Sequence, residues 1–200
     1  MSRPSLAHTR RAEILRAIEE CIREVGVAGL TTQQVADRSG YSRGHVRHYL
    51  GNKNDQLRAL VELYSERYAS SLERLVGEVP QSRKREIVLR ELFGETWLSA
   101  DTQDDVVLDY ISAYALSHPD AGISLAPLYE RVVVVVADAL ASGTSDEDAT
   151  TRARTVVALA FGVASMMSLG VMQAKDAQGY AAELLGVAVD ATTESAERLT

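Results

Sequence analysis

Four side chains that can bind nucleic acid lie close together in the segment 31–53, which reads TTQQVADRSGYSRGHVRHYLGNK. They are Arg43, His45, Arg47 and His48. Arginine and histidine donate hydrogen bonds to phosphates and to base edges, and a helix that carries such donors fits the major groove of B-DNA. A second helix must cross the DNA backbone to hold the first in place. The segment therefore predicts a helix-turn-helix that reads DNA.

Capping signals place two short helices in this segment. Thr31 followed three residues later by Gln34 fits a capping box, so a helix is expected to begin there. It is expected to end before Gly40, because glycine adopts the left-handed conformation that terminates helices. Ser42 can cap the next helix, 43–50. This second helix is the predicted recognition helix.

Two alternatives apply to the same residues. Capped helices with exposed arginines also occur in all-α proteins that bind no DNA, where such side chains are simply solvated. His45 and His48 lie three residues apart and could bind a metal, but no carboxylate or thiol lies near them in sequence, so no metal site is expected. Gly44, near the start of the second helix, favours DNA binding because it lets the backbone approach a phosphate closely.

Positive charge is concentrated at one end of the chain. Residues 1–58 contain 10 Lys or Arg and 6 Asp or Glu, whereas the remainder contains 11 and 22, within a total of −7. Association with DNA depends on the local field, so an acidic protein can bind through a basic end. We expect residues 1–58 to form a DNA-binding domain and residues 59–200 a separate acidic body.

From about residue 10 to residue 57 the sequence resembles the tetracycline-repressor (TetR) family of bacterial transcription regulators. The resemblance rests on RAEILRAIEECIREVG, TTQQVADRSG, YSRGHVRHYL and GNKNDQL, in this order. It implies DNA contacts from the start of the second helix, from the recognition helix and from the lysine that opens the fourth helix. The expected DNA-binding residues are Thr31, Thr32, Gln33, Arg43, Gly44, His45, Arg47, His48, Tyr49 and Lys53.

Three positions depart from the family pattern. Arg47 stands where the family commonly has tyrosine, Leu50 where it has phenylalanine and Gln56 where it often has leucine. The contact made by residue 47 is therefore expected to differ, and the local core to be lighter.

The helix that precedes this segment carries an apolar stripe that can pack against the DNA-binding domain, which we call the head. Ile14, Ile18, Ile22 and Val25 follow one another at spacings of four, four and three, which predicts a buried face. Arginines at the start of this helix, at positions 10 and 11, could meet phosphates or remain solvated.

The rest of the chain is predicted to be helical, which gives an all-α fold of about nine helices with a larger C-terminal ligand-binding and dimerisation domain. The run Val132–Val136 has high strand propensity, but it lies in a long helical pattern and is expected to be a fully buried helix. The segment 155–174 carries no charge and could span a bilayer, but its many small and polar residues favour a buried helix. Expected helices cover 53–78, 82–99, 103–117, 124–142, 146–174 and 177–197.

Two apolar stripes, one on each of the last two expected helices, predict a homodimer. Their residues repeat at spacings of three and four, as in packed antiparallel helices, and the TetR resemblance implies a two-fold dimer. Packing within one chain is the alternative. The predicted interface residues are Ala153, Val157, Ala160, Ala164, Met167, Val171, Tyr180, Leu184, Val187 and Ala191. A symmetric dimer would bind a palindromic double-stranded DNA operator.

Aromatic residues in the body predict a cavity for a small-molecule effector. Nine of the eleven aromatic residues lie beyond residue 58, and an ordinary aromatic core is the alternative. The candidate lining residues are Phe93, Trp97, Tyr110, Tyr114, Phe161 and Met166. The run LDYISAYALSHPDAGISLAPLYER is loosely similar to the body of the choline-responsive branch of the family, but the effector stays unidentified.

The sequence holds no phosphate-binding loop, nucleophile elbow or metal-ligand spacing, so we expect neither an enzyme nor a cofactor. The single cysteine excludes an intramolecular disulfide, and the absence of a signal-like N-terminal stretch predicts a cytoplasmic protein that does not enter the membrane. The sequence thus predicts a ligand-responsive regulator, most simply a repressor. The rivals are an architectural DNA-binding protein without an effector, and a helical carrier or enzyme.

Overall fold

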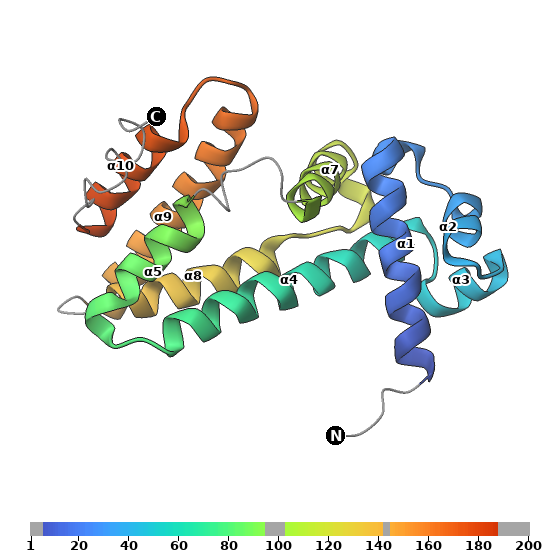
Figure 1. Ribbon diagram of the computed structural model, residues 1–200, viewed down its shortest axis with the longest axis horizontal. Helices are drawn as coiled ribbons and strands as arrows, with labels where there is room; N and C mark the ends of the chain where they lie inside the picture. Colours follow the sequence, from blue (N-terminus) through green and yellow to red (C-terminus); the bar gives the residue numbers. More distant parts are fainter. Residues whose placement is uncertain (1–5, 95–102, 142–144, 188–200) are drawn as a thin grey trace, which may run out of the picture. The chain divides into compact units, whose positions relative to one another are not determined.

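The computed structural model describes residues 6–94, 103–141 and 145–187. Within these ranges the chain forms nine α-helices and one 3-10 turn, and no strand, which confirms the predicted all-α class (Figure 1). The helices are α1 (Leu6–Gly29), α2 (Thr32–Ser39), α3 (Arg43–Leu50), α4 (Lys53–Gly77), α5 (Gln81–Phe93), α7 (Gln103–Ser117), α8 (Ala126–Leu140), α9 (Asp146–Ser168) and α10 (Ala174–Leu185), and the 3-10 turn η1 covers Pro119–Ala121.

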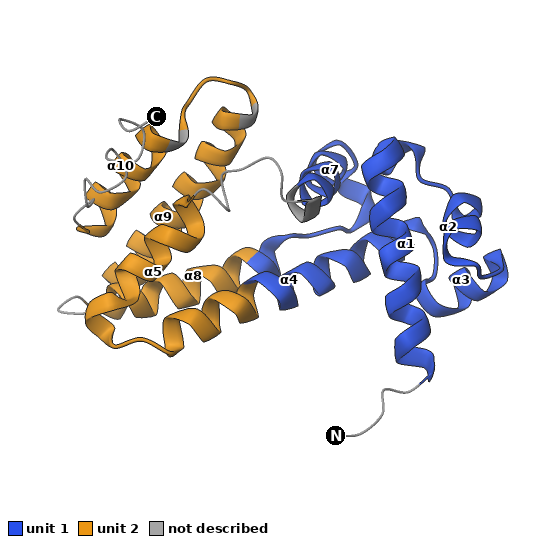
Figure 2. Ribbon diagram, viewed as in Figure 1, with its two compact units in different colours: residues 1–68, 100–128 blue, residues 69–99, 129–200 orange. Residues whose placement is uncertain are grey.

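The chain forms two compact units (Figure 2). The first unit contains residues 1–68 and 100–128, and the second contains residues 69–99 and 129–200. Helix α4 therefore begins in the first unit and ends in the second. The expected boundary at residue 58, between a DNA-binding domain and an acidic body, is a functional division, and it stays a prediction.

Helix α1 supplies the centre of the first unit and packs against α2, α3 and α7. Ile14, Ile18 and Ile22 are fully buried, as the apolar stripe predicts. Val25 was expected on the same face but is 40% exposed. The reason is local: Gly26 leaves the helical conformation, with φ 68° and ψ 173°, so the buried face does not continue past Ile22 in register.

Helix α7 belongs to the same unit as the helix-turn-helix although it lies far from it in sequence. Val107 and Ile111 are fully buried on this helix. The ring of Tyr110 lies against Gly26, and a Cβ at position 26 would meet it at 3.6 Å. The break in α1 is thus covered by an aromatic side chain from α7.

A buried carboxylate joins α1 to α4. The side chain of Glu19 is only 6% exposed, and its Oε1 accepts a hydrogen bond at 3.1 Å from Nη1 of Arg67, which is 46% exposed. A buried charge is costly unless it is paired and hydrogen-bonded. The packing of α4 against α1 therefore places the guanidinium of Arg67 where it pairs with the buried carboxylate of Glu19.

The second unit has its own core. Val88 and Phe93 of α5, Leu140 of α8 and Leu185 of α10 are all buried. Arg131 of α8 donates to both carboxylate oxygens of Glu73 in the last turns of α4, each at 3.0 Å. Apolar packing and this two-point ion pair hold the helices of the unit together.

The five-valine run is helical, as expected, but it is not fully buried. Val132, Val135 and Val136 face the core, whereas Val134 is largely exposed. A helix turns by 3.6 residues, so five consecutive side chains cannot all face one side.

Two helix ends differ from those expected. Helix α9 ends at Ser168 and not at 174, because the backbone turns at Gly170, whose φ is 71°. Helix α10 begins at Ala174 and ends at Leu185, where Gly186 forms a left-handed cap. The expected extension of this helix to 197 lies mostly outside the described residues.

No helix in the described part of the chain is long and apolar enough to cross a bilayer. The uncharged segment 155–174 is divided by the turn after α9.

The Glu19–Arg67 pair gives a test of how the first unit is held together. We expect Arg67→Met to lower the free energy of unfolding by about 1–3 kcal/mol, because the carboxylate of Glu19 would stay buried without its guanidinium. Urea unfolding measures the change.

Arg74→Met is the matched control. Arg74 lies on the same helix, but it is exposed and pairs with Glu78 only at 4.0 Å, so its loss is expected to change stability by less than about 0.5 kcal/mol. Equal losses in both variants would contradict a structural role for the buried pair. A second change, Glu19→Gln, is expected to recover part of the stability lost in Arg67→Met.

Candidate nucleic-acid interface

The helix-turn-helix is fixed by the predicted caps. The Thr31 hydroxyl accepts a hydrogen bond from the Gln34 amide at 3.3 Å, and the Gln34 side chain accepts one from the Thr31 amide at 2.9 Å, which completes a capping box. Gly40 ends α2 in the left-handed conformation, with φ 73° and ψ 10°. The Ser42 hydroxyl then caps α3 by accepting from the His45 amide at 3.2 Å. These local signals set the angle between the two helices.

Helix α3 presents one apolar face and one polar face. Val46 and Leu50 are buried against the rest of the head. Tyr49 lies at the edge of this face and is half-buried. The exposed residues are Arg43, Gly44, His45, Arg47 and His48, all of them expected at the DNA.

Two arginines on the exposed face are free to bind a ligand. Within the described residues, the guanidinium groups of Arg43 and Arg47 make no hydrogen bond or ion pair. They lie four residues apart and so share one face of the helix. Their charge is not neutralised by neighbouring carboxylates, as binding to phosphates or guanines requires.

The end of the recognition helix is held from α1. Arg10 donates to the Tyr49 hydroxyl at 3.2 Å, and Arg11 donates to the Tyr49 carbonyl at 3.1 Å. The first arginine is exposed and the second half-buried. In this structure the two arginines therefore orient the recognition helix, a role that the sequence did not indicate.

The two histidines of α3 are held by short-range contacts. Nδ1 of His45 lies 3.0 Å from the Ser42 hydroxyl, and the His48 ring packs edge-on against Tyr49 with centroids 5.2 Å apart. No group of three His, Cys, Asp or Glu side chains in the described ranges could hold a metal ion.

The start of α2 offers fewer free groups than expected. Thr31 uses its hydroxyl in the cap, and Thr32 is half-buried. Gln33 is exposed, but its amide donates to Asp37 at 2.7 Å. A contact from these side chains to DNA stays a prediction.

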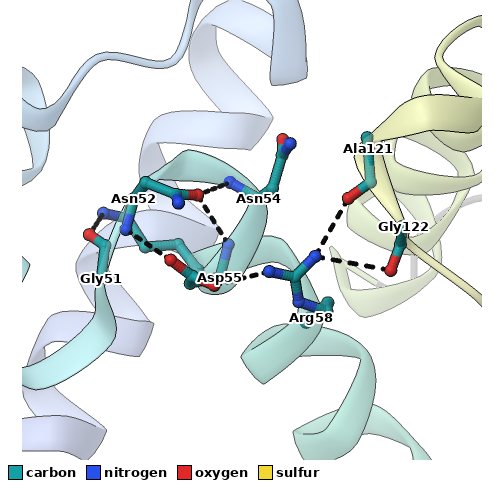
Figure 3. Close-up of polar contacts among 8 residues, drawn as sticks. Gly51, Asn52, Asn54, Asp55, Arg58, Ala121 and Gly122 are labelled. Carbon is teal, nitrogen blue, oxygen red and sulfur yellow. Dashed lines mark hydrogen bonds and ion pairs between the residues drawn. The ribbon is translucent and has the colours of Figure 1, made fainter.

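The start of α4 is organised around one carboxylate (Figure 3). The Asn52 side chain accepts from the amides of Asn54 and Asp55 at 2.9 and 3.1 Å, and Asp55 accepts from the Asn52 amide at 2.9 Å. Asp55 also accepts from Arg58 at 2.5 Å, and Arg58 donates onward to the Ala121 carbonyl at 3.0 Å. The hydrogen bond from the Asn52 amide and the ion pair with Arg58 hold the pKa of Asp55 below its usual value.

Comparison with known proteins agrees with this geometry. Residues 14–60 match the family model described as bacterial regulatory proteins of the tetR family. This segment contains α2, α3 and most of the head's buried stripe. This part of the chain, the head with the helix-turn-helix, belongs to the TetR family.

The relatives cover different parts of the chain. HTH-type transcriptional regulator BetI from Burkholderia ambifaria is 34% identical over 103 residues, 50% of this chain and 53% of its own length. The chain thus spans about half the length of the curated relatives that it matches. A TetR transcription regulator from Haloarcula marismortui has a TM-score of 0.75 at 22% identity, over 89% of this chain and 97% of its own. The multidrug binding protein EbrR, complexed with imidazole, has a TM-score of 0.68 at 21% identity over 92% of both chains. At these identities the two structures show the fold alone.

The structure explains how glutamine is tolerated at position 56, one of the departures from the TetR pattern. Gln56, where leucine is often found, is 1% exposed, and its amide donates to the Gly51 carbonyl at 3.2 Å. The polar side chain is therefore accommodated by the end of α3. Leu50, in place of phenylalanine, is buried as well.

Lys53 of this TetR-family head does not project freely. Its ammonium group donates to the Ala28 carbonyl at 3.3 Å and lies 5.3 Å from the centroid of the Tyr114 ring. Burial lowers the pKa of the Lys53 ammonium. Neither partner could be identified from sequence, because both come from elements distant along the chain.

The predicted effector residues fall in both units of the chain, so a shared cavity stays a prediction. The Phe161 ring packs edge-on against Tyr129, with centroids 4.2 Å apart. Tyr110 and Tyr114 belong to the first unit, Phe93, Phe161 and Met166 belong to the second, and Trp97 lies outside the described residues.

The predicted dimer residues divide into two groups. Those at the start of α9 face the chain's own core, which agrees with the alternative of packing within one chain. Val171 and Tyr180, by contrast, are 72% and 57% exposed. Ala153, Val157 and Ala160 are buried, Ala164, Met167, Leu184 and Val187 are half-buried, and Ala191 lies outside the described residues.

Asp55 gives a pH-dependent test of this head. Because its pKa is lower in the folded protein than the ordinary 3.8, the carboxylate stabilises the fold above that pH, and the contribution is lost as the pH falls through the lowered pKa. We expect Asp55→Asn to lower the melting temperature at neutral pH, and the difference from the wild type to shrink as the pH falls below 3.8 through the lowered pKa.

Asp176→Asn is the control, because Asp176 also lies in a first turn, that of α10. Its effect at neutral pH is expected to be smaller, since a first-turn charge alone contributes little. A difference for Asp55→Asn that is independent of pH would show that the charge of Asp55 is not what stabilises the start of α4.

Proposed function

We propose that this chain is a homodimeric transcriptional regulator that binds a palindromic DNA operator and is released from it by a small molecule. The observation that carries the proposal is the exposed face of α3, where Arg43 and Arg47 are free of partners among the described residues. A rigid, capped helix with unneutralised arginines suits the major groove. Membership of the TetR family supports the same function.

The distribution of charge supports binding through this end alone. Residues 1–58 have a surplus of four positive charges, whereas the rest of the chain has a surplus of eleven negative charges. DNA attracts the first and repels the second. The protein therefore approaches a duplex with α3 leading.

A dimer is proposed because one recognition helix reads too little DNA for specificity. Two heads related by a two-fold axis would contact successive major grooves, roughly 34–36 Å apart, and so select a palindrome. The second unit exposes large apolar side chains near the junction of α9 and α10 that suit a partner surface. They are Met166, Leu169, Val171 and Tyr180.

Control by a small molecule is proposed from the family and from the aromatic residues of the body. EbrR, which has the same fold, is a multidrug binding protein solved with imidazole. An effector that binds the DNA-free conformation better shifts the equilibrium away from DNA, typically by about 1–3 kcal/mol. We infer that the chain acts as a repressor in the cytoplasm and not as an enzyme.

Selection of bound fragments from genomic DNA tests the proposal. We expect a palindromic site whose affinity falls steeply with salt, because phosphate contacts release counterions. Genes beside the site would indicate metabolites to test as effectors. A protein that bound no duplex at low salt would rule out the function, and binding that no metabolite relieved would favour the architectural alternative.

Arg43 and Arg47 give a residue-level test. They lie about 6 Å apart along the helix axis, so they can reach guanines within the same half-site. We expect alanine at either position to cost about 1–3 kcal/mol of operator affinity and to relax the guanine preference at one base pair. Affinity titration and repeated site selection measure both effects.

Arg83→Ala is the control, because it removes an exposed arginine from α5, outside the head. It is expected to keep the wild-type site. If Arg43→Ala and Arg47→Ala selected that site with full affinity, the assignment of these arginines to base reading would be wrong.

The dimer surface is tested at Tyr180. We expect Tyr180→Glu to convert dimer to monomer in sedimentation equilibrium, because it introduces a charge on an apolar surface. Gln173→Glu adds the same charge at an exposed polar position at the start of α10 and is expected to leave the dimer intact. An unchanged dimer in Tyr180→Glu would contradict an interface at this residue.

A further inference from the structure

We propose that Tyr114 is a positioning residue that holds Lys53 away from DNA, so that operator binding requires Lys53 to leave the Tyr114 ring for a phosphate. The proposal rests on the proposed DNA-binding function. It adds to that function a residue of α7 that limits affinity without touching the duplex.

Within the described part of the chain, the groups that hold the Lys53 ammonium are neutral. Its ammonium lies 3.3 Å from the Ala28 carbonyl and 5.3 Å from the Tyr114 centroid, and the side chain is half-buried. Burial lowers its pKa, and no carboxylate in the described part of the chain opposes that effect. A partly desolvated ammonium that has only a carbonyl and a ring face as partners would gain from an anion.

The place of Lys53 in its helix points to the same conclusion. It is the first residue of α4, where the helix dipole favours negative charge and disfavours a lysine. A phosphate at this helix end would interact favourably with both the helix dipole and the ammonium. The contacts to Ala28 and Tyr114 are then the ones that DNA must displace.

Tyr114 is itself firmly placed. The His118 ring stacks on it with centroids 4.1 Å apart and planes 14° apart, and His118 Nδ1 lies 3.1 Å from the Tyr114 carbonyl and 3.0 Å from the Ser117 hydroxyl. The turn that follows is tied to α4 by the hydrogen bond from Arg58 to Ala121, drawn in Figure 3. The ring therefore cannot follow Lys53 when the lysine moves.

The test compares operator affinity across four single variants and one double variant. Tyr114→Leu removes the ring face, so we expect binding to tighten by about threefold to tenfold per head, the usual strength of a cation–π contact. Tyr114→Phe keeps the ring and is expected to bind like the wild type. Lys53→Ala is expected to reduce the slope of log affinity against log salt by about 0.9 per head, the loss of one phosphate contact.

The double variant distinguishes this mechanism from a general loosening of the fold. In a Lys53→Ala background, Tyr114→Leu is expected to have no effect, because no ammonium is left to release. Leu116→Ala truncates another large side chain of α7, one that is 86% exposed, and is expected to leave affinity unchanged. Circular dichroism establishes that each variant is folded.

A direct readout is available from NMR. The Lys53 Hε resonances are expected to show a ring-current shift from Tyr114, and this shift is expected to vanish when operator DNA is added. A wild type that binds DNA, together with a Tyr114→Leu variant of unchanged affinity, would overturn this inference alone. A wild type that binds no DNA would overturn the proposed function.

Discussion

The carboxylate of Asp55 is the contact on which the arrangement of the first unit depends. It completes the cap of α4 through the Asn52 amide, and it orients Arg58 toward the carbonyl of Ala121. One side chain thus determines where α4 begins and attaches the end of α7 to it.

The recognition helix α3 is likewise positioned by a small number of contacts. Short caps set the course of α3, two arginines of α1 hold its far end at Tyr49, and a buried glutamine satisfies the carbonyl of Gly51 where it finishes. None of these contacts uses Arg43 or Arg47. The head therefore separates the side chains that shape it from those left available for a ligand.

The sequence predicted what local chemistry determines. The caps at Thr31 and Ser42, the left-handed Gly40 and the polar face of α3 depend on residues a few positions apart, and the structure confirms them. Contacts such as Lys53 with Tyr114, or Arg10 with Tyr49, depend on helices brought together by folding, and no local pattern indicates them. The predicted end of α9 was wrong because composition alone did not show at which glycine the chain would turn.

Helix α7 packs against α1 and belongs to the same unit as the helix-turn-helix, although the chain reaches it only after leaving the first unit. Recombination between relatives that exchanged only the N-terminal segment would separate α1 from the aromatic side chain that covers its break at Gly26. A functional chimera must inherit both stretches from the same parent, so the reading head and this distant helix form one unit of inheritance.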